Sequence, residues 1–81
     1  MTEPADAVLV DARGRRCPAP VIELARAADA AGPGALIRLL ATDPASRYDV
    51  PAWCRMRGQR LVDVSEDDGA LTFVVQTSRR G

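Results

Sequence analysis

Cys17 opens the tetrapeptide Cys17-Pro18-Ala19-Pro20 and is the residue of this chain best placed to do chemistry. It follows a strand-like apolar run at residues 8–10 and precedes a helical pattern, so its thiol should lie at a helix N-terminus. Free N–H groups and the helix dipole favour a thiolate there, and in comparable settings they lower a cysteine pKa from about 8.5 to about 3.5–7.5. Pro18 suits the first helical position, where its missing N–H would have had no intrahelical partner. The same residues also permit a purely structural role, with Cys17 as a weak cap and Pro18 and Pro20 shaping the turn.

The residue types that the chain lacks narrow this chemistry. There is no histidine, and all 11 basic residues are arginines. Without lysine there is no Schiff-base chemistry, and without histidine a cysteine hydrolase or acyltransferase lacks its usual proton acceptor. The two cysteines, Cys17 and Cys54, are too far apart in the sequence to indicate a zinc site. We therefore expect neither metal nor cofactor, and a thiol whose reactivity comes from its setting.

Length and composition indicate one small globular domain. The 81 residues, 47% apolar and 27% charged, predict a single domain over residues 1–81 with its core at about 7–77 and frayed ends. No apolar run approaches the roughly 18 residues of a membrane span, and the N-terminal residues do not resemble a signal peptide, so we expect a cytoplasmic protein. The formal net charge of zero gives no reason to expect direct nucleic-acid binding.

Periodicity and turn residues predict the element order β-α-β-α-β-β. The strands are predicted at residues 7–12, 35–41, 61–66 and 71–77. The first helix is predicted at residues 18–31, and a second helix, capped by Asp49 with Pro51 in its first turn, runs to Gly58. An Asp-Gly pair between the last two strands is typical of a hairpin.

These elements predict an α/β two-layer sandwich, in which a four-stranded mixed sheet carries two helices on one face. A right-handed crossover pairs the first two strands in parallel, and the hairpin adds antiparallel pairing. The loop after the first strand then leaves the carboxyl edge of the sheet, where functional groups usually lie, and carries Cys17. Asp11 is expected to accept hydrogen bonds from N–H groups of this loop, and Gly14 to supply a positive φ.

Three motifs stand in a specific order along the chain. They are LVDARGRRCPAP at residues 9–20, TDPAS at residues 42–46, and DVPAWC at residues 49–54 followed by Gly58. In these motifs, and over residues 9–75 as a whole, the chain resembles the TusA/SirA family of sulfur carriers. The resemblance implies the same β-α-β-α-β-β sandwich, in agreement with the periodicity.

The resemblance implies a protein that accepts sulfane sulfur as a persulfide on Cys17 and relays it to a partner. The implied partners are a cysteine desulfurase or another persulfide donor, and a downstream acceptor in tRNA 2-thiouridine synthesis, molybdenum-cofactor maturation or sulfur oxidation. Nothing demands more than a monomer with transient contacts. Transpersulfidation resembles thiol–disulfide exchange and needs an ionised, accessible thiol but no histidine.

The arginines beside the cysteine have two interpretations. Arg13, Arg15 and Arg16 could stabilise a sulfur anion or dock a partner surface, or they could be solvated loop residues without a role. Arg15 also stands where the family commonly has an apolar residue, and Gln59 where a histidine is common, so that histidine is not essential if the activity is kept.

Two further interpretations are left open. Cys54 is expected on the inward face of the second helix as a small apolar residue, with a resolving thiol for Cys17 as the alternative. Trp53 and Tyr48 are expected to pack in the core or anchor a partner. The alternative function for the chain is a non-catalytic regulatory or RNA-binding module, since the family fold is shared with a translation initiation factor domain.

Overall fold

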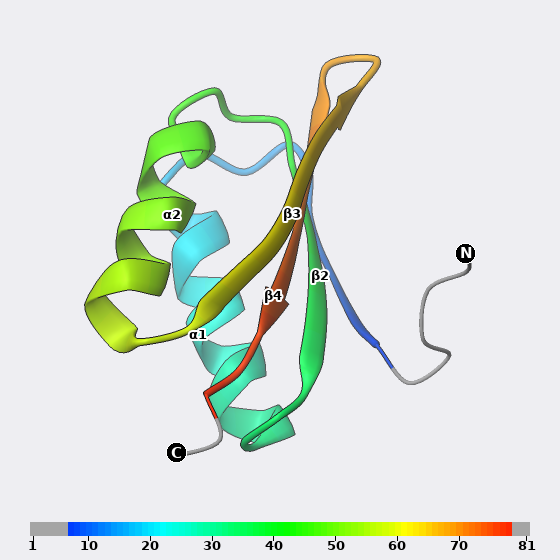
Figure 1. Cartoon of the computed structure of the whole chain (residues 1–81). Helices are drawn as coiled ribbons and strands as arrows, with labels where there is room; N and C mark the ends of the chain where they lie inside the picture. Colours follow the sequence, from blue (N-terminus) through cyan, green and yellow to red (C-terminus); the bar gives the residue numbers. More distant parts are fainter. Residues whose placement is uncertain (1–6, 79–81) are drawn as a thin grey trace.

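Two helices cover one face of a four-stranded mixed sheet (Figure 1). The computed structural model describes residues 7–78, so the predicted fraying at residues 1–6 and 79–81 lies outside the described part. Ser78, expected in the frayed tail, donates its N–H to Gln59 Oε1 at 2.6 Å. The elements follow the predicted order: β1 Val8–Ala12, α1 Ala19–Ala31, β2 Leu36–Ala41, α2 Ser46–Arg57, β3 Arg60–Asp67 and β4 Ala70–Gln76.

The sheet has the order β1-β2-β4-β3. β1 pairs with β2 in parallel, and β4 pairs antiparallel with both β2 and β3. The predicted fold class is therefore confirmed, and β2 takes the central place that its apolar sequence indicated. β3 and β4 are joined through Asp68 and Gly69, with φ of 53° and 82°, as a two-residue hairpin turn requires.

The core lies between the sheet and the helices. Alternate residues of β2 and β4 point toward the helices, and Ile37, Leu39, Phe73 and Val75 have no exposed surface. Leu24 of α1 is equally buried, and each such side chain contributes about 1.5–3 kcal/mol by leaving water. This core fixes the two helices against the sheet and so fixes the loops at its edge.

The structure corrects the predicted start of the second helix. α2 begins at Ser46, so Asp49 lies inside its first turn and is not the N-cap. The helix starts earlier because the preceding residues make a tight turn around Asp43. Its carbonyl accepts the N–H of Ser46 at 3.0 Å, and its Oδ1 accepts the N–H of Ala45 at 2.9 Å. Pro51 consequently lies inside the helix rather than in its first turn, and its missing N–H leaves one helical hydrogen bond unmade.

Neither described helix is long and apolar enough to cross a membrane.

Leu39→Ala should lower the free energy of unfolding by about 2–5 kcal/mol, because it leaves a cavity beneath a central strand. Leu9→Ala is the matched control, since the Leu9 side chain on β1 is 61% exposed, and it should change stability by less than about 0.5 kcal/mol. Urea unfolding followed by circular dichroism measures both. Equal losses in the two variants would contradict this assignment of the core.

Candidate functional site

Cys17 lies in the loop between β1 and α1, at the carboxyl edge of the parallel strand pair (Figure 1). We call residues 13–18 the cysteine loop. The last residues of β1 and β2, Ala12 and Ala41, are register partners, so the segments that follow them leave the sheet side by side. The second of these segments, residues 42–46, we call the clamp segment.

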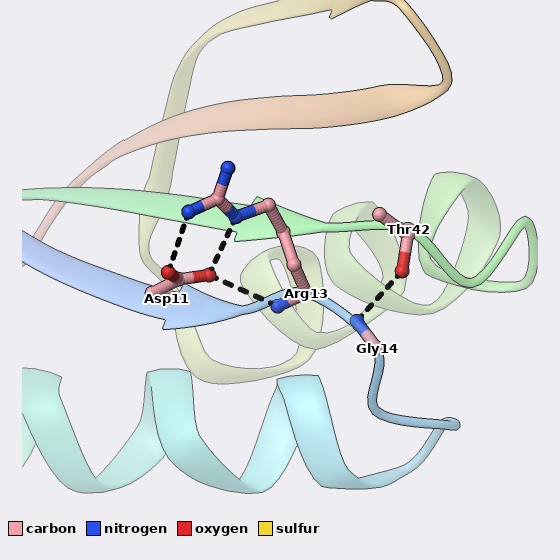
Figure 2. Close-up of polar contacts among 4 residues, drawn as sticks. All are labelled: Asp11, Arg13, Gly14 and Thr42. Carbon is pink, nitrogen blue, oxygen red and sulfur yellow. Dashed lines mark hydrogen bonds and ion pairs between the residues drawn. The ribbon is translucent and has the colours of Figure 1, made fainter.

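The clamp segment holds the cysteine loop at three points. Gly14 donates its N–H to Thr42 Oγ1 at 2.8 Å (Figure 2), and Cys17 donates its N–H to Asp43 Oδ2 at 2.8 Å. At the third point, Cys17 Sγ lies 3.3 Å from Ser46 Oγ. Gly14 has a φ of +82°, which confirms the positive φ predicted for this glycine. The backbone of Cys17 is thus fixed from the neighbouring strand connection, 26 residues further along the chain.

The Asp43 side chain connects the two segments through its two oxygens. Its two carboxylate oxygens accept N–H groups from different segments, Ala45 of the clamp segment and Cys17 of the cysteine loop. These hydrogen bonds, with a smaller contribution from the charge of Arg16, hold the pKa of Asp43 below its usual value. Asp43 is therefore a charged acceptor at neutral pH.

Asp11 and Arg13 form a separate, closed contact (Figure 2). Asp11 Oδ1 accepts the Arg13 N–H at 3.1 Å, which confirms the predicted hydrogen bond to the loop backbone. The Arg13 guanidinium binds both carboxylate oxygens, at 2.8 and 2.7 Å. The hydrogen bond from this guanidinium is the main cause that lowers the pKa of Asp11 to about 2. The expected docking role of Arg13 thus competes with its ion pair to Asp11 of β1.

The other two arginines also face carboxylates. Arg15 Nε lies 3.1 Å from Glu23 Oε2 of α1, and the charge of Arg16 acts on Asp43. Ion pairs therefore join Arg13 to Asp11 and Arg15 to Glu23, whereas Arg16 acts on Asp43 through its charge alone. Among the described residues, the charges that act on the Cys17 sulfur are the carboxylates of Asp49 and Asp43.

The environment of the Cys17 thiol differs from the prediction. Partial burial raises its pKa, the hydrogen bond with Ser46 lowers it, and the hydrogen bond and charge of Asp49 and the charge of Asp43 raise it again. The net shift is upward, so the thiol is protonated at neutral pH and the predicted resting thiolate is wrong.

The first turn of α1 shows why the expected stabilisation of an anion is weak. Pro18 directly precedes the helix and Pro20 is buried within its first turn, and neither carries an N–H. The N–H of Ala19 is already donated to the Arg16 carbonyl at 2.9 Å. Few donors therefore face the sulfur, and the predicted gain from the helix N-terminus is offset by the neighbouring carboxylates.

An apolar groove lies beside the cysteine loop, between α1 and α2. It has a volume of about 220 Å³ and is lined by Pro18, Val21, Asp49, Ala52, Trp53 and Met56. Met56 is 78% exposed, and the side chain of Tyr48 on the same helix is 73% exposed. Tyr48 thus belongs to the surface.

Cys54 and Trp53 belong to the core. Cys54 is a free cysteine, 2% exposed, and burial raises the pKa of its thiol. This confirms its predicted place on the inward face of α2. Its burial as a protonated thiol gives no support to the alternative of a resolving cysteine.

Sequence reasoning missed the contacts of Ser46 and Asp43 with Cys17. The motif TDPAS stands out in the sequence as one of the three motifs of the family resemblance, but local patterns do not reveal which loop such a segment faces. The parallel pairing of the first two strands was the available signal, because it places the segments after both strands at one edge.

Comparisons with known proteins identify the family of this chain. The family model described as sulfurtransferase TusA matches residues 8–77. A sulfur carrier protein TusA of Pseudomonas paraeruginosa is 40% identical over 76 residues, covering 94% of this chain and 95% of the relative. One from Pseudomonas putida is 38% identical over 71 residues, covering 88% of each. This chain belongs to the TusA family.

A solved structure shares the fold. The crystal structure of a SirA-like protein from Desulfitobacterium hafniense superposes with a TM-score of 0.79, covering 88% of this chain and 97% of that one, at 23% identity. At this identity the likeness supports the arrangement of strands and helices only.

Asp49→Asn should lower the pKa of the Cys17 thiol, because it removes a negative charge that disfavours the thiolate. The midpoint of the pH profile of Cys17 alkylation by iodoacetamide should therefore move to lower pH. Asp63→Asn on the exposed face of β3 is the matched control and should leave the profile in place. An unchanged midpoint in Asp49→Asn would contradict the assigned electrostatics.

Arg13→Ala should raise the pKa of Asp11 from about 2 toward the usual value of 3.8, since the guanidinium is its main stabilising partner. Because the folded-state pKa is depressed, the stabilisation is present above pH 3.8 and is lost as pH falls through about 2. NMR titration of the Asp11 carboxyl carbon measures the change. Arg57→Ala, at the end of α2, is the control and should keep the lowered pKa of Asp11. An Asp11 pKa near 3.8 in that control would contradict the pairing with Arg13.

Proposed function

We propose that this chain is a sulfur carrier that holds sulfane sulfur as a persulfide on Cys17 and transfers it to a partner protein. The observation that carries the proposal is the half-buried Cys17 thiol, whose backbone is fixed by Asp43 at the sheet edge. Membership of the TusA family supports it, since relatives with 40% and 38% identity are sulfur carrier proteins.

The proposed loading step is a displacement at sulfur. Cys17 Sγ, once deprotonated, attacks the outer sulfur of the donor's persulfide and forms a new S–S bond. The S–S bond of the donor breaks, and the donor cysteine leaves as a thiolate that takes up a proton. Unloading is the same step in reverse, with an acceptor thiolate attacking the outer sulfur and Cys17 Sγ as the leaving group.

The protonated resting thiol is compatible with this role. A persulfide is more acidic than a thiol, so the loaded form can be ionised at neutral pH although the unloaded form is not. A donor whose docking surface is basic would also offset the charges of Asp43 and Asp49 and favour the thiolate within the complex.

The proposed partners follow from the same chemistry. The donor is a protein that itself carries a persulfide, such as a cysteine desulfurase, and the acceptor is a relay protein of tRNA 2-thiouridine synthesis or of another sulfur-trafficking pathway. The apolar groove beside Cys17 is the surface on which we expect them to dock, since it has an exposed methionine at its edge.

Incubation with a cysteine desulfurase and cysteine should add the mass of one sulfur atom to the protein. Cys17→Ser should abolish the gain, because it removes the accepting sulfur, and Cys54→Ala should keep it, because Cys54 is buried. Intact-protein mass spectrometry under non-reducing conditions measures the product. No gain with several competent donors, together with full cellular function of Cys17→Ser, would favour the non-catalytic interaction module instead.

A further inference from the structure

Ser46 is a buried polar residue whose hydroxyl contacts the sulfur of Cys17. It has no exposed surface and is the first residue of α2. Thr77, the other buried polar residue of the described part, donates its hydroxyl to the Gly32 carbonyl and accepts the Ala35 N–H, so it serves the backbone. The Ser46 hydroxyl instead lies 3.3 Å from Cys17 Sγ. A buried hydroxyl needs a partner, and here that partner is the reacting sulfur.

The state of the sulfur decides the direction of this hydrogen bond. While Cys17 is a thiol, either group can donate. Once Sγ carries a negative charge it is an acceptor only, and the Ser46 hydroxyl must donate to it. A hydrogen bond to a charged acceptor is about twice as strong as a neutral one, so the contact strengthens when charge reaches the sulfur.

We propose that Ser46 is a positioning residue for sulfur transfer, whose buried hydroxyl orients Cys17 Sγ and donates a hydrogen bond to the negative charge that this sulfur carries during loading and unloading. The inference deepens the proposed function and rests on it for its role in transfer. Its effect on the sulfur itself depends only on the geometry.

The hydrogen bond acts in both directions of transfer. In loading, Ser46 stabilises the Cys17 thiolate that attacks the donor's outer sulfur. In unloading, the S–S bond breaks with its electron pair moving to Cys17 Sγ, and the same hydroxyl stabilises this leaving thiolate. In unloading, where the charge develops on Sγ as the S–S bond breaks, this interaction lowers the barrier more than it stabilises the ground state.

Ser46 acts on the Cys17 thiolate in the opposite direction to the carboxylates around it. Asp49 of α2 and Asp43 of the clamp segment disfavour the anion. On the facing elements, Arg15 is paired with Glu23, and the charge of Arg16 acts on Asp43. Among the described side chains that act on the Cys17 ionisation, Ser46 is the one that favours the thiolate.

The expected size of the effect is moderate. One ordinary hydrogen bond corresponds to roughly a threefold to tenfold change in the thiolate fraction below the pKa. A more basic thiolate is also more nucleophilic, which offsets about half of this change on a logarithmic scale. The transfer rate should therefore fall only about twofold to threefold without Ser46.

The test compares Ser46→Ala and Ser46→Thr with the unchanged protein, with Ser65→Ala on exposed β3 as a matched control. The first readout is the pH profile of iodoacetamide alkylation of Cys17, followed by mass spectrometry of its peptide, which needs no sulfur donor. The second is the rate of persulfide loading from a cysteine desulfurase. Thermal unfolding of each variant establishes that it is folded.

In Ser46→Ala the alkylation midpoint should move to higher pH, with alkylation at neutral pH slowed about twofold to threefold. Ser46→Thr, which keeps a hydroxyl, should restore the profile, and Ser65→Ala should not change it. A folded Ser46→Ala with an unchanged midpoint would overturn the inference, as would a folded Ser46→Thr that behaves like Ser46→Ala. If the unchanged protein fails to load while the Ser46→Ala profile shifts, the proposed function fails and the effect of Ser46 on the sulfur stands.

Discussion

The Asp43 carboxylate is the interaction on which this site depends. One of its oxygens accepts the Cys17 N–H and the other accepts the Ala45 N–H, so a single side chain joins the cysteine loop to the start of α2. The parallel pairing of β1 with β2 makes this possible, because Ala12 and Ala41 end at the same edge of the sheet. The core beneath both helices then keeps the two loops from separating.

The electrostatics of the site decide how the Cys17 thiol ionises without a histidine partner. Burial and the carboxylates of Asp49 and Asp43 raise the pKa of the Cys17 thiol and so disfavour its thiolate. Among the described side chains that act on this thiol, Ser46 opposes them through its hydrogen bond. Under the proposed function, this sulfur becomes anionic when it is loaded or when a partner changes its surroundings.

The surface around the sulfur divides into two parts. On one side lie two arginines in ion pairs, Arg13 with Asp11 and Arg15 with Glu23. The α1–α2 side is open and apolar, with exposed Met56 at its edge. The groove reaches the cysteine loop at Pro18 and is lined by none of these four ion-paired residues.

The sequence by itself determined the element order, the two-layer fold, the hairpin turn at Asp68 and Gly69, and the place of Cys17 after β1. These features follow from local periodicity and backbone preferences. Only the tertiary structure decided where α2 begins and what surrounds the sulfur. The groups that set the Cys17 ionisation, among them Ser46 and Asp49, lie about thirty residues away and approach through strand pairing. Local sequence patterns do not show which distant residues come together. The direction of the Cys17 pKa shift was therefore decided by tertiary packing.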